Sequence, residues 1–398
     1  MKEIAINKMH SRRQINILFL ALVVIMLGYG MVIPIMPFYI EWLGASGTEL
    51  GLLMASYSLL QLIFAPVWGG ISDRIGRKPV MMIGLLGDTI AMLLFGFSTK
   101  LWMLFAARSL TGLLSSATLP TTMAYVSDST TEEERGSGMG NLGAAMGLGM
   151  ILGPGVGGWL AGDSLSTPFF FAAGLSFLTL ILVWLFVPES LPPEKRELVS
   201  RSKKKDPVLK HVREAIKSPI FVLLFMMFLL SFGLTNFEAI FGLYALDKFG
   251  YRPQQVGTIL TVIAVVSTLG KALMTGPAVK RFGEAFIIKI SLIASSVAFG
   301  VLLQADTYLT ILLATAFFIL AKTLLRPAVL SLTSKRAKSG QGAAMGLCNS
   351  FMSLGRIIGP IWAGLVYDVN INYPYMSGVV IMFLGFLVSL VWVKQKVD

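Results

Sequence analysis

Two carboxylates lie deep inside long apolar stretches of the sequence. Asp88 falls in the stretch around residues 80–97, and Glu238 falls in the stretch around 219–244. An acid placed in the hydrocarbon of a membrane is costly and is a functional candidate by default, and the chemistry open to it is reversible protonation. The structural alternative is a buried ion pair with a cation from the same stretches. Six such cations occur, namely Arg108, Lys271, Lys289, Lys322, Arg326 and Arg356.

The depth of these cations differs. Lys271 and Lys289 lie near the ends of their stretches, where a long side chain can extend to the membrane surface. Lys322, Arg326 and Arg356 lie deeper, and the spacing of the first two predicts one shared helix face. They are candidates for contact with an anionic or zwitterionic substrate, or for pairing with backbone carbonyls and helix ends. The sequence leaves both interpretations open.

Other reaction chemistries have little support in the sequence. Cys348 is the one cysteine, and His10 and His211 both fall in polar segments, so we expect neither a disulfide framework nor a metal site. The phosphate-binding pattern G-x-x-x-x-G-K-[ST] does not occur, so direct use of ATP is not expected. We therefore predict a protein without cofactors and without enzyme activity.

The composition of the chain indicates what holds these residues. Of its 398 residues, 55% are apolar and 14% are charged, whereas soluble domains contain about 25% charged residues. This excludes a disordered chain, a coiled coil and an ordinary soluble enzyme. The net charge of +12 would suggest nucleic acid binding on a soluble protein. On a membrane protein, an excess of Lys and Arg first indicates which side of the membrane each loop lies on. We therefore expect no nucleic acid partner.

The sequence contains twelve stretches long enough to cross a bilayer, each needing about 20 largely apolar residues. We expect the first to stay in place as a span, because it is longer than a signal-peptide core and contains two prolines. The predicted fold class is an all-α membrane protein with 12 transmembrane helices. The stretches are 15–38, 50–68, 80–97, 101–125, 138–161, 167–187, 219–244, 255–276, 285–303, 308–332, 343–366 and 374–393.

The distribution of Lys and Arg predicts the orientation of these spans. With the N-terminus in the cytoplasm, the inside segments hold 24 cations and the outside loops hold three. This bias is the positive-inside pattern, so both termini are predicted to be cytoplasmic. The segment 188–218 is the longest and most basic loop. We interpret it as a cytoplasmic linker that sets topology, and contact with anionic lipid headgroups is the alternative interpretation.

The two halves of the chain resemble each other at a fixed offset. Five positions of the fifth span recur 206 residues later in the eleventh span. The predicted domains are therefore a six-helix half at 1–187, the linker at 188–218 and a second six-helix half at 219–398. Duplicated halves imply a central pathway and rocking between inward-open and outward-open states. The matched pairs are Gly140 and Gly346, Gly149 and Gly355, Gly153 and Gly359, Pro154 and Pro360, and Gly158 and Gly364.

Four motifs give the chain a resemblance to the major facilitator superfamily over nearly its whole length. The loop 69–78 resembles the G-x-L-A-D-R-x-G-R-K pattern. Its glycine permits an unusual backbone angle, and its charges can pair at helix ends as a conformational latch. A basic turn that only sets topology is the alternative. The latch residues are Asp73, Arg74, Gly76, Arg77 and Lys78.

The other motifs lie within spans. Leu27-Gly28, followed by Pro34 and Pro37, resembles the kinked first span of the twelve-span drug exporters. Arg108 resembles the intramembrane arginine associated with proton transfer, although it lies close enough to the outer side to extend there. The fifth span resembles the motif that separates exporters from symporters. Its small residues allow close helix contact at Gly149, Gly153, Pro154, Gly157 and Gly158.

The resemblance also implies site residues. The segment containing Glu238 is similar to the seventh span of Gram-positive multidrug pumps, where a glutamate is tied to proton and cationic drug handling. Those pumps carry an aspartate three residues before an Arg-Pro pair, whereas this chain has Thr323 there. Asp88 and Arg108 are the other proton-coupling candidates. The substrate-binding candidates are Tyr29, Met36, Gln61, Met123, Phe232, Asn236, Phe241, Lys322, Arg326, Phe351 and Arg356.

The sequence thus predicts a proton-coupled multidrug efflux antiporter of the bacterial plasma or inner membrane. Its partners would be amphipathic drugs, protons and membrane lipid, and one chain would suffice to function as a monomer. The alternatives are a narrower exporter of tetracycline, a sugar or a lipid-linked metabolite, and a proton-symport importer, which the fifth-span motif opposes. A receptor would need a large soluble region and an enzyme a polar catalytic cluster, and neither is visible in the sequence.

Overall fold

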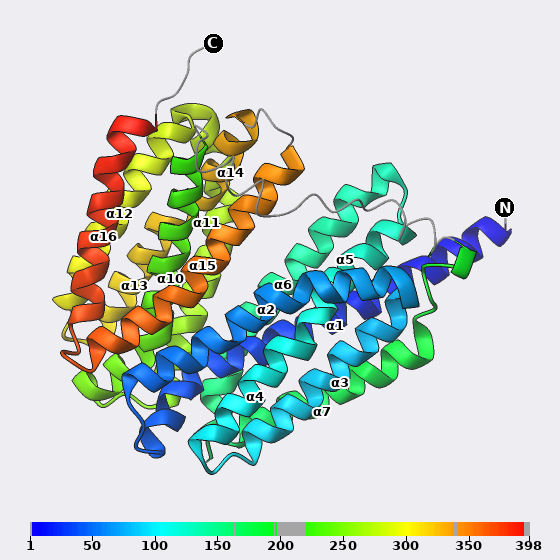
Figure 1. The fold of residues 1–398 in the computed structure, drawn as a ribbon, viewed down its shortest axis with the longest axis horizontal. Coiled ribbons are helices and arrows are strands. Elements are labelled where there is room, and N and C mark those ends of the chain that lie inside the picture. The colour runs from blue at the N-terminus through cyan, green and yellow to red at the C-terminus, as the bar shows by residue number, and fades with distance from the viewer. Residues whose placement is uncertain (1, 163, 195, 197–219, 337–340, 394–398) are drawn as a thin grey trace. The chain divides into compact units, whose positions relative to one another are not determined.

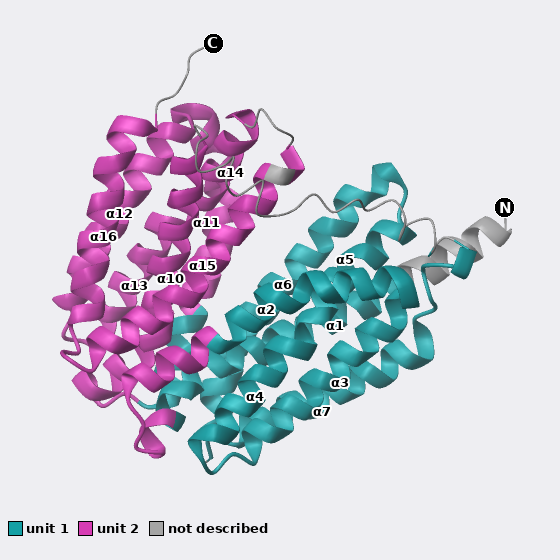
Figure 2. Cartoon of the chain, viewed as in Figure 1, with its two compact units in different colours: residues 1–39, 56–204, 252–261 teal, residues 40–55, 205–251, 262–398 magenta. Residues whose placement is uncertain are grey.

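The computed structural model describes residues 2–162, 164–194, 196, 220–336 and 341–393, and every regular element in these ranges is a helix (Figure 1). The all-helical prediction is therefore confirmed for this part of the chain. Most of the predicted linker 188–218 lies outside the described residues. The chain divides into two compact units (Figure 2). Unit 1 comprises Met1–Tyr39, Ser56–Lys204 and Arg252–Thr261, and unit 2 comprises Ile40–Ala55, Lys205–Tyr251 and Val262–Asp398.

The helices from the first half of the sequence come in chain order with short connections. They are α1 (Lys2–Trp42), α2 (Gly47–Ile75), α3 (Arg77–Gly96), α4 (Leu101–Leu114), the 3-10 turn η1 (Ser115–Ala117), α5 (Thr118–Ser129), α6 (Glu132–Leu160) and α7 (Thr167–Phe186).

The second half repeats this order. Its helices are α10 (Phe221–Phe249), α11 (Pro253–Phe282), α12 (Glu284–Leu303), α13 (Tyr308–Thr323), α14 (Leu325–Arg336), α15 (Gln341–Tyr367) and α16 (Tyr373–Trp392). Among the described residues, ten helical segments are long and apolar enough to cross a membrane. Two predicted spans are not among these ten segments. The span 101–125 is broken into α4, η1 and α5, and the span 343–366 corresponds to α15. The count of twelve spans stays a prediction.

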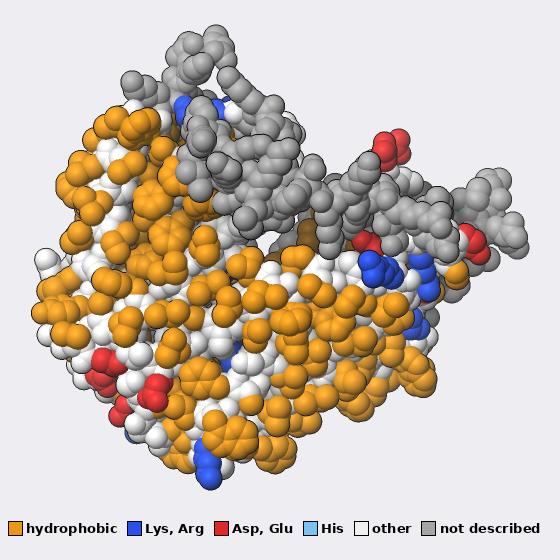
Figure 3. Space-filling model, in the orientation of Figure 1, with side chains coloured by type: hydrophobic (Ala, Val, Ile, Leu, Met, Phe, Trp, Pro, Cys, Tyr) orange, Lys and Arg blue, Asp and Glu red, His pale blue; other side chains and the backbone are white. Residues whose placement is uncertain are grey.

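Apolar side chains are distributed as a bilayer requires. Hydrophobic side chains cover most of the face seen in Figure 3, and acidic and basic ones gather toward its edges. Tryptophans are exposed at helix ends, as at Trp42 of α1, Trp102 of α4 and Trp159 of α6, with 61%, 66% and 76% exposure. Aromatic rings at such places anchor helices at the membrane–water interface.

Buried contacts join the helices inside each unit. In unit 1 a continuous apolar core joins α1, α3, α5, α6 and α7. In unit 2 aromatic rings of α10, α12, α13 and α16 pack together, with Phe299 and Phe318 at a centroid distance of 4.5 Å and Tyr244 and Tyr375 at 4.6 Å. Ring pairs at such distances add to the stabilisation from apolar burial. These contacts hold the polar positions described below in fixed places.

Two helices are shared between the units at their first turns. The first residues of α2 belong to unit 2, and those of α11 belong to unit 1. A Cβ on Gly364 of α15 would lie 2.9 Å from Cα of Thr48, and one on Gly158 of α6 would lie 3.0 Å from Cα of Gly257. Glycine at both places allows the backbones to meet, and Gly158 and Gly364 belong to the 206-residue repeat.

Candidate functional site

The first candidate site in unit 1 forms where a helix is broken. Pro120 has no N–H to offer to the carbonyl of Ser116, so the helix cannot continue regularly through this point. The chain instead adopts the 3-10 turn Ser115–Ala117. The carbonyl oxygen of Leu113 accepts hydrogen bonds from Trp68 Nε1 at 2.6 Å and Ser116 Oγ at 3.0 Å. The break also turns the hydroxyl of Ser115 toward α3.

Asp88 of α3 lies opposite this break. Its side chain is buried, and its Oδ1 accepts a hydrogen bond from Ser115 Oγ at 3.0 Å. Gly28 of α1 leaves space beside the other oxygen, since a Cβ there would lie 4.0 Å from Oδ2. Within the described ranges no cation forms an ion pair with Asp88 within 4.0 Å. A buried ion pair, the structural alternative raised for this acid, is therefore not what the structure contains.

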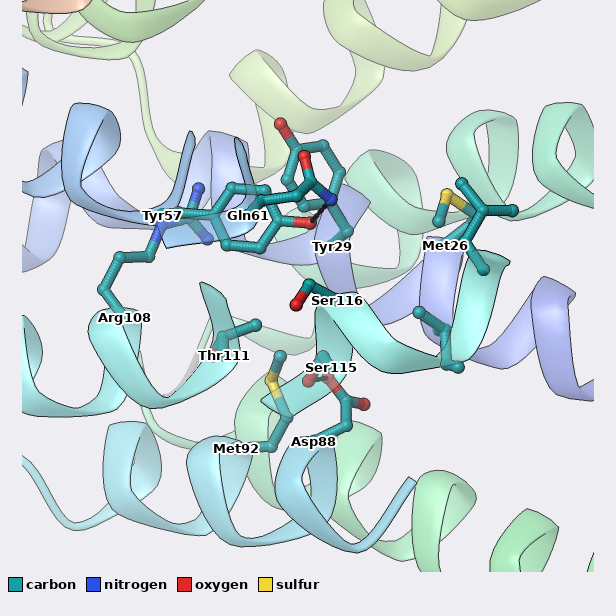
Figure 4. Close-up of a pocket in the computed structure, with 12 residues that line it drawn as sticks. Met26, Tyr29, Tyr57, Gln61, Asp88, Met92, Arg108, Thr111, Ser115 and Ser116 are labelled. Carbon is teal, nitrogen blue, oxygen red and sulfur yellow. Dashed lines mark hydrogen bonds between the residues drawn. The ribbon is translucent and has the colours of Figure 1, made fainter. Parts of the chain in front are cut away.

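Asp88 and Arg108 line one small cavity (Figure 4). Its volume is about 30 Å³, and a cavity needs roughly 10–15 Å³ of such space to hold a water molecule. The Arg108 guanidinium lies over the rings of Tyr57 at 4.7 Å and Tyr29 at 5.6 Å. Arg108 is buried, so it does not extend outward from the helix end. Hydroxyls of Thr111, Ser115 and Ser116 complete the polar wall.

The predicted residues Tyr29, Gln61, Asp88 and Arg108 all line this cavity. Gln61 Nε2 donates a hydrogen bond to the Tyr57 hydroxyl oxygen at 2.9 Å. Sequence reasoning missed Tyr57, Thr111, Ser115 and Ser116. The signal for Ser115 and Ser116 was available, because two serines precede a proline inside a predicted span. A chain with a carboxylate, hydroxyls and a water-sized space can move a proton between them.

The second candidate site is in unit 2, around Glu238 of α10. The cations that act electrostatically on this carboxylate are Lys322 of α13, Arg356 of α15 and Lys271 of α11. None of them is within ion-pairing distance of 4.0 Å. Glu238 is half-buried. It is therefore an acid near several positive charges but not locked to one of them.

Among these three cations, Lys322 lies next to a break in its helix. Pro327 cannot donate to the carbonyl of Thr323, and α13 ends at Thr323 before α14 begins at Leu325. Lys322 and Arg326 thus lie on either side of a one-residue interruption at Leu324, whose backbone angles stay in the α region, and their shared face stays a prediction. The Lys322 ammonium is buried, finds no hydrogen-bond acceptor among the described residues, and lies 5.4 Å from the ring centroid of Phe318.

Arg326 and Arg356 act on each other electrostatically, and Arg326 also acts on Lys271. The side chains of all three are exposed on the surface of the protein chain. Together with Lys322 they form a group of four cations, three of which act electrostatically on Glu238, whereas Arg326 acts on Arg356 and Lys271. We call these five residues the unit 2 charge cluster.

The glycines of α6 and α15 have equivalent roles in the two units. A Cβ on Gly149 would lie 2.5 Å from Met26 Cβ of α1, and one on Gly153 would lie 2.7 Å from the Leu27 carbonyl oxygen. A Cβ on Gly157 would lie 2.9 Å from Met31 Cα, so the same contact continues along α1. In unit 2, a Cβ on Gly355 would lie 2.6 Å from the Phe228 carbonyl oxygen of α10. Small residues thus allow close backbone approach in both places.

The loop between α2 and α3 holds an ion network. Arg77 donates to Asp73 at 2.6 Å, to Asp128 at 3.0 Å and to Ser72 Oγ at 2.7 Å. Gly76 has φ of 110°, which an L side chain rarely adopts, so glycine is required here. Lys78 donates from its ammonium to the Trp184 carbonyl at 2.7 Å, whereas the Arg74 side chain is exposed. The backbone N–H groups of Arg77 and Lys78 donate to the Glu189 carboxylate.

Unit 2 has residues of opposite charge at the equivalent positions, and one of the two ion pairs is repeated there. Asp73, Arg77 and Asp128 correspond, 207 residues later, to Lys280, Glu284 and Lys335. Glu284 pairs with Lys335, and its Oε1 also accepts from Ser331 Oγ at 2.8 Å. Gly283 repeats the positive φ of Gly76, at 76°. The turn geometry has been kept between the halves, and the sign of each charge has been exchanged.

The remaining substrate-binding candidates have varied surroundings. Met36 and Phe241 are buried, and Phe241 stacks on Phe237 at 4.9 Å. Asn236 donates from Nδ2 to the Pro374 carbonyl at 2.9 Å, so it joins α10 to α16. Met123 of α5 is exposed, and Phe232 of α10 is buried. Phe351 of α15 is partly buried and packs against Phe221.

These helices and charged positions have counterparts in known proteins. The sequence profile of the Major Facilitator Superfamily matches residues 18–251 and 223–398. The chain belongs to this superfamily. It is accordingly a multi-pass membrane transporter and not an enzyme.

Two relatives match nearly the full length. The chain is 34% identical to Multidrug resistance protein 2 of Bacillus subtilis over 393 residues, which covers 98% of each chain. It is 30% identical to Quinolone resistance protein NorA of Staphylococcus aureus over 381 residues, or 95% of this chain and 96% of NorA.

Solved structures show the same fold at lower identity. A bacterial homologue of the human lysosomal transporter Spinster matches with a TM-score of 0.82 and 14% identity, over 98% of this chain and 99% of the other. The nucleoside transporter NupG matches with a TM-score of 0.79 and 14% identity, over 96% and 100%.

Proposed function

We propose that this transporter is a proton-coupled antiporter that exports amphipathic drugs by alternating access. The observation that carries the proposal is the state of Glu238, a membrane-embedded acid influenced by three cations without an ion pair to any described residue. Such a group can exchange a proton for the positive part of a drug. The names of its relatives, which concern multidrug and quinolone resistance, support export of drugs.

The proposed cycle has the proton and the drug compete for Glu238. A proton that enters from outside binds the carboxylate, removes its negative charge and lowers its affinity for the drug, which then leaves. Coupling of this kind needs only that the two ligands cannot both be bound well. The carboxylate of Asp88, with the hydroxyls and the water-sized cavity beside it, is the proposed second proton-binding position, and Arg108 is placed beside the same cavity.

The contacts made by the other sequence motifs have supporting roles in this proposal. The Asp73–Arg77–Asp128 network is proposed as the latch that favours one access state. The α1–α6 contact along Gly149, Gly153 and Gly157 is proposed to close that side of the protein against proton leak. Twelve spans in two halves with cytoplasmic termini, acting as a monomer, complete the proposed architecture.

The test uses the full chain in everted membrane vesicles with an acidic interior. Uptake of tetramethylrhodamine methyl ester, a fluorescent cation, should depend on the proton gradient. The Glu238→Gln variant should lose this dependence and bind the dye more weakly, because the neutral amide, like the protonated acid, no longer attracts the positive ring. Asp306→Asn, which changes an exposed acid of the same unit, is the control and should behave like the original chain.

Two results would contradict the proposal. Gradient-driven dye uptake by Glu238→Gln at the original rate would remove the assigned role of Glu238. A chain that moves no dye under any gradient, but accumulates a sugar together with protons, would replace export by import.

A further inference from the structure

We infer that Lys322 is a binding position for a carboxylate, and that the preferred substrates carry both a positive group and a carboxylate. This inference rests on the proposed function and specifies the substrate class of the same site. It follows from the balance of charge in the unit 2 charge cluster and from the surroundings of the Lys322 ammonium.

The first observation is an excess of positive charge. Glu238 is the one acid of the cluster. Lys271, Lys322 and Arg356 act on it electrostatically, and Arg326 adds a fourth positive charge through Arg356 and Lys271. A positive charge on a membrane-spanning helix is expensive unless a counter-charge is present, and this cost is greatest for Lys322, whose ammonium is the buried one of the four. Even with Glu238 ionised, the cluster lacks negative charge, and a bound anion would supply it.

The second observation is that the Lys322 ammonium is unsatisfied. Its nitrogen is buried and has no acceptor among the residues that the structure describes, although an ammonium offers three donors. The end of α13, only one residue away, places negative partial charge near the ammonium. That stabilises the charge but supplies no hydrogen bond within range. A carboxylate oxygen is the acceptor that an ammonium binds most strongly.

The third observation concerns the apolar side of the position. The Phe318 ring lies 5.4 Å from the Lys322 ammonium and packs at a tilt against Phe237 and Phe299, with centroids at 5.1 and 4.5 Å. An aromatic surface beside an unsatisfied ammonium fits a molecule whose carboxylate is attached to a flat ring system. This combination is typical of amphipathic compounds rather than of small hydrophilic anions.

Exchange against a proton then requires that the substrate also has a positive group. A purely anionic substrate would bind better once Glu238 is protonated, because the cluster then has even less negative charge. It would therefore travel with the proton rather than against it. A substrate with a positive group competes with the proton for Glu238, while its carboxylate remains on Lys322. A zwitterionic substrate is therefore compatible with proton antiport, and its carboxylate also supplies the negative charge that the cluster lacks.

The experiment compares two dyes that differ in one ester bond. Tetramethylrhodamine has a permanently positive xanthylium ring and a free carboxylate, and its methyl ester retains only the positive ring. Binding of each dye to the purified full chain in detergent is measured by fluorescence polarisation. The original chain should bind the free carboxylate form about tenfold more tightly than the ester, as a charge-assisted hydrogen bond would produce.

Lys322→Met should abolish this preference, with the ester bound as before, because methionine fills the same space without charge. Lys289→Met is the matched control, since it removes a cation of α12 from the same unit, and it should keep the preference. Equal binding of the two dyes by the original chain would overturn the inference. An unchanged preference in Lys322→Met would also overturn it.

The same dyes separate this inference from the proposed function. If vesicles show gradient-driven uptake of the ester but the purified chain has no preference for the carboxylate form, antiport stands and the carboxylate position fails. If the preference and its loss in Lys322→Met are observed without gradient-driven uptake, the carboxylate position stands and proton antiport fails. If neither dye binds, both fail.

Discussion

Ser115 and Lys322 occupy the same structural position in the two units. They are 207 residues apart, and each lies five residues before a proline that interrupts its helix, Pro120 in one case and Pro327 in the other. Ser115 donates a hydrogen bond to Asp88, while Lys322 acts on Glu238 electrostatically. The duplicated fold thus places a polar side chain at each break, whereas the acids that these side chains face come from non-equivalent helices, α3 in unit 1 and α10 in unit 2. Broken membrane helices commonly form ion and substrate sites.

The first prediction concerns Asp88. The Asp88→Asn variant should fold normally, since an amide oxygen can still accept the hydrogen bond from Ser115. It cannot ionise, so gradient-driven dye uptake in everted vesicles should fall at least tenfold if proton transfer contributes about 10²–10⁴ to the rate. Dye binding in detergent should remain as in the original chain. Uptake at the original rate would show that Asp88 only joins α3 to the helix break.

The second prediction concerns the contact between α6 and α1. In Gly153→Ala, the new Cβ would lie 2.7 Å from the Leu27 carbonyl oxygen and 2.8 Å from Gly30 Cα, so backbone has to shift. Overpacking of this kind costs about 1–3 kcal/mol, and the midpoint of thermal unfolding should fall. Gly143→Ala in the same helix is the control, because nothing lies within 4 Å of its new Cβ.

Gly143→Ala should leave the midpoint unchanged or raise it, because alanine favours helix over glycine by about 0.5–1 kcal/mol. Equal midpoints for the two variants would mean that α6 and α1 do not rely on their close approach. A fall in the coupling of dye uptake to the gradient in Gly153→Ala alone would additionally support a role of this contact in limiting proton leak.

The third prediction separates two arginines of the same loop. Arg77→Gln leaves Asp73 and Asp128 without their shared cation, and the Arg77 and Asp73 side chains are only 6% and 7% exposed. Removing one partner of a buried pair costs about 3–5 kcal/mol. The thermal midpoint should therefore drop clearly. Arg74→Gln changes an exposed side chain and should have little effect, although the motif contains both residues. A comparable loss in both variants would count against the network.

Much of this arrangement could be predicted from the sequence. The long apolar stretches predicted the helices, and the repeat of Gly149 and Gly153 at Gly355 and Gly359 predicted equivalent helix contacts. These features can be predicted from the sequence because the hydrophobic period and the residue size act locally along a helix.

The rest could not be predicted because it depends on contacts between distant segments. Nothing in the span pattern indicated that Ser115 would meet Asp88, that Tyr57 would lie under Arg108, or that the first turn of α2 would pack on α15. The interruption between Lys322 and Arg326 was not predicted either, although Pro327 is the residue that causes it.

The last prediction tests the break itself. Pro327→Ala restores an N–H that can donate to the Thr323 carbonyl, so α13 and α14 can join into one regular helix. A proline inside a continuous helix costs about 3 kcal/mol. Because Pro327 lies in the first turn of α14, where a missing N–H costs little, the variant should be more stable to heat by only part of that amount. Function should change in the opposite direction. A regular helix would rotate Lys322 relative to Glu238, and the preference for the carboxylate form of the dye should shrink.

Pro168→Ala is the control, because this proline is in the first turn of α7, where the missing N–H costs nothing. Higher stability with an undiminished preference would mean that the break does not position Lys322.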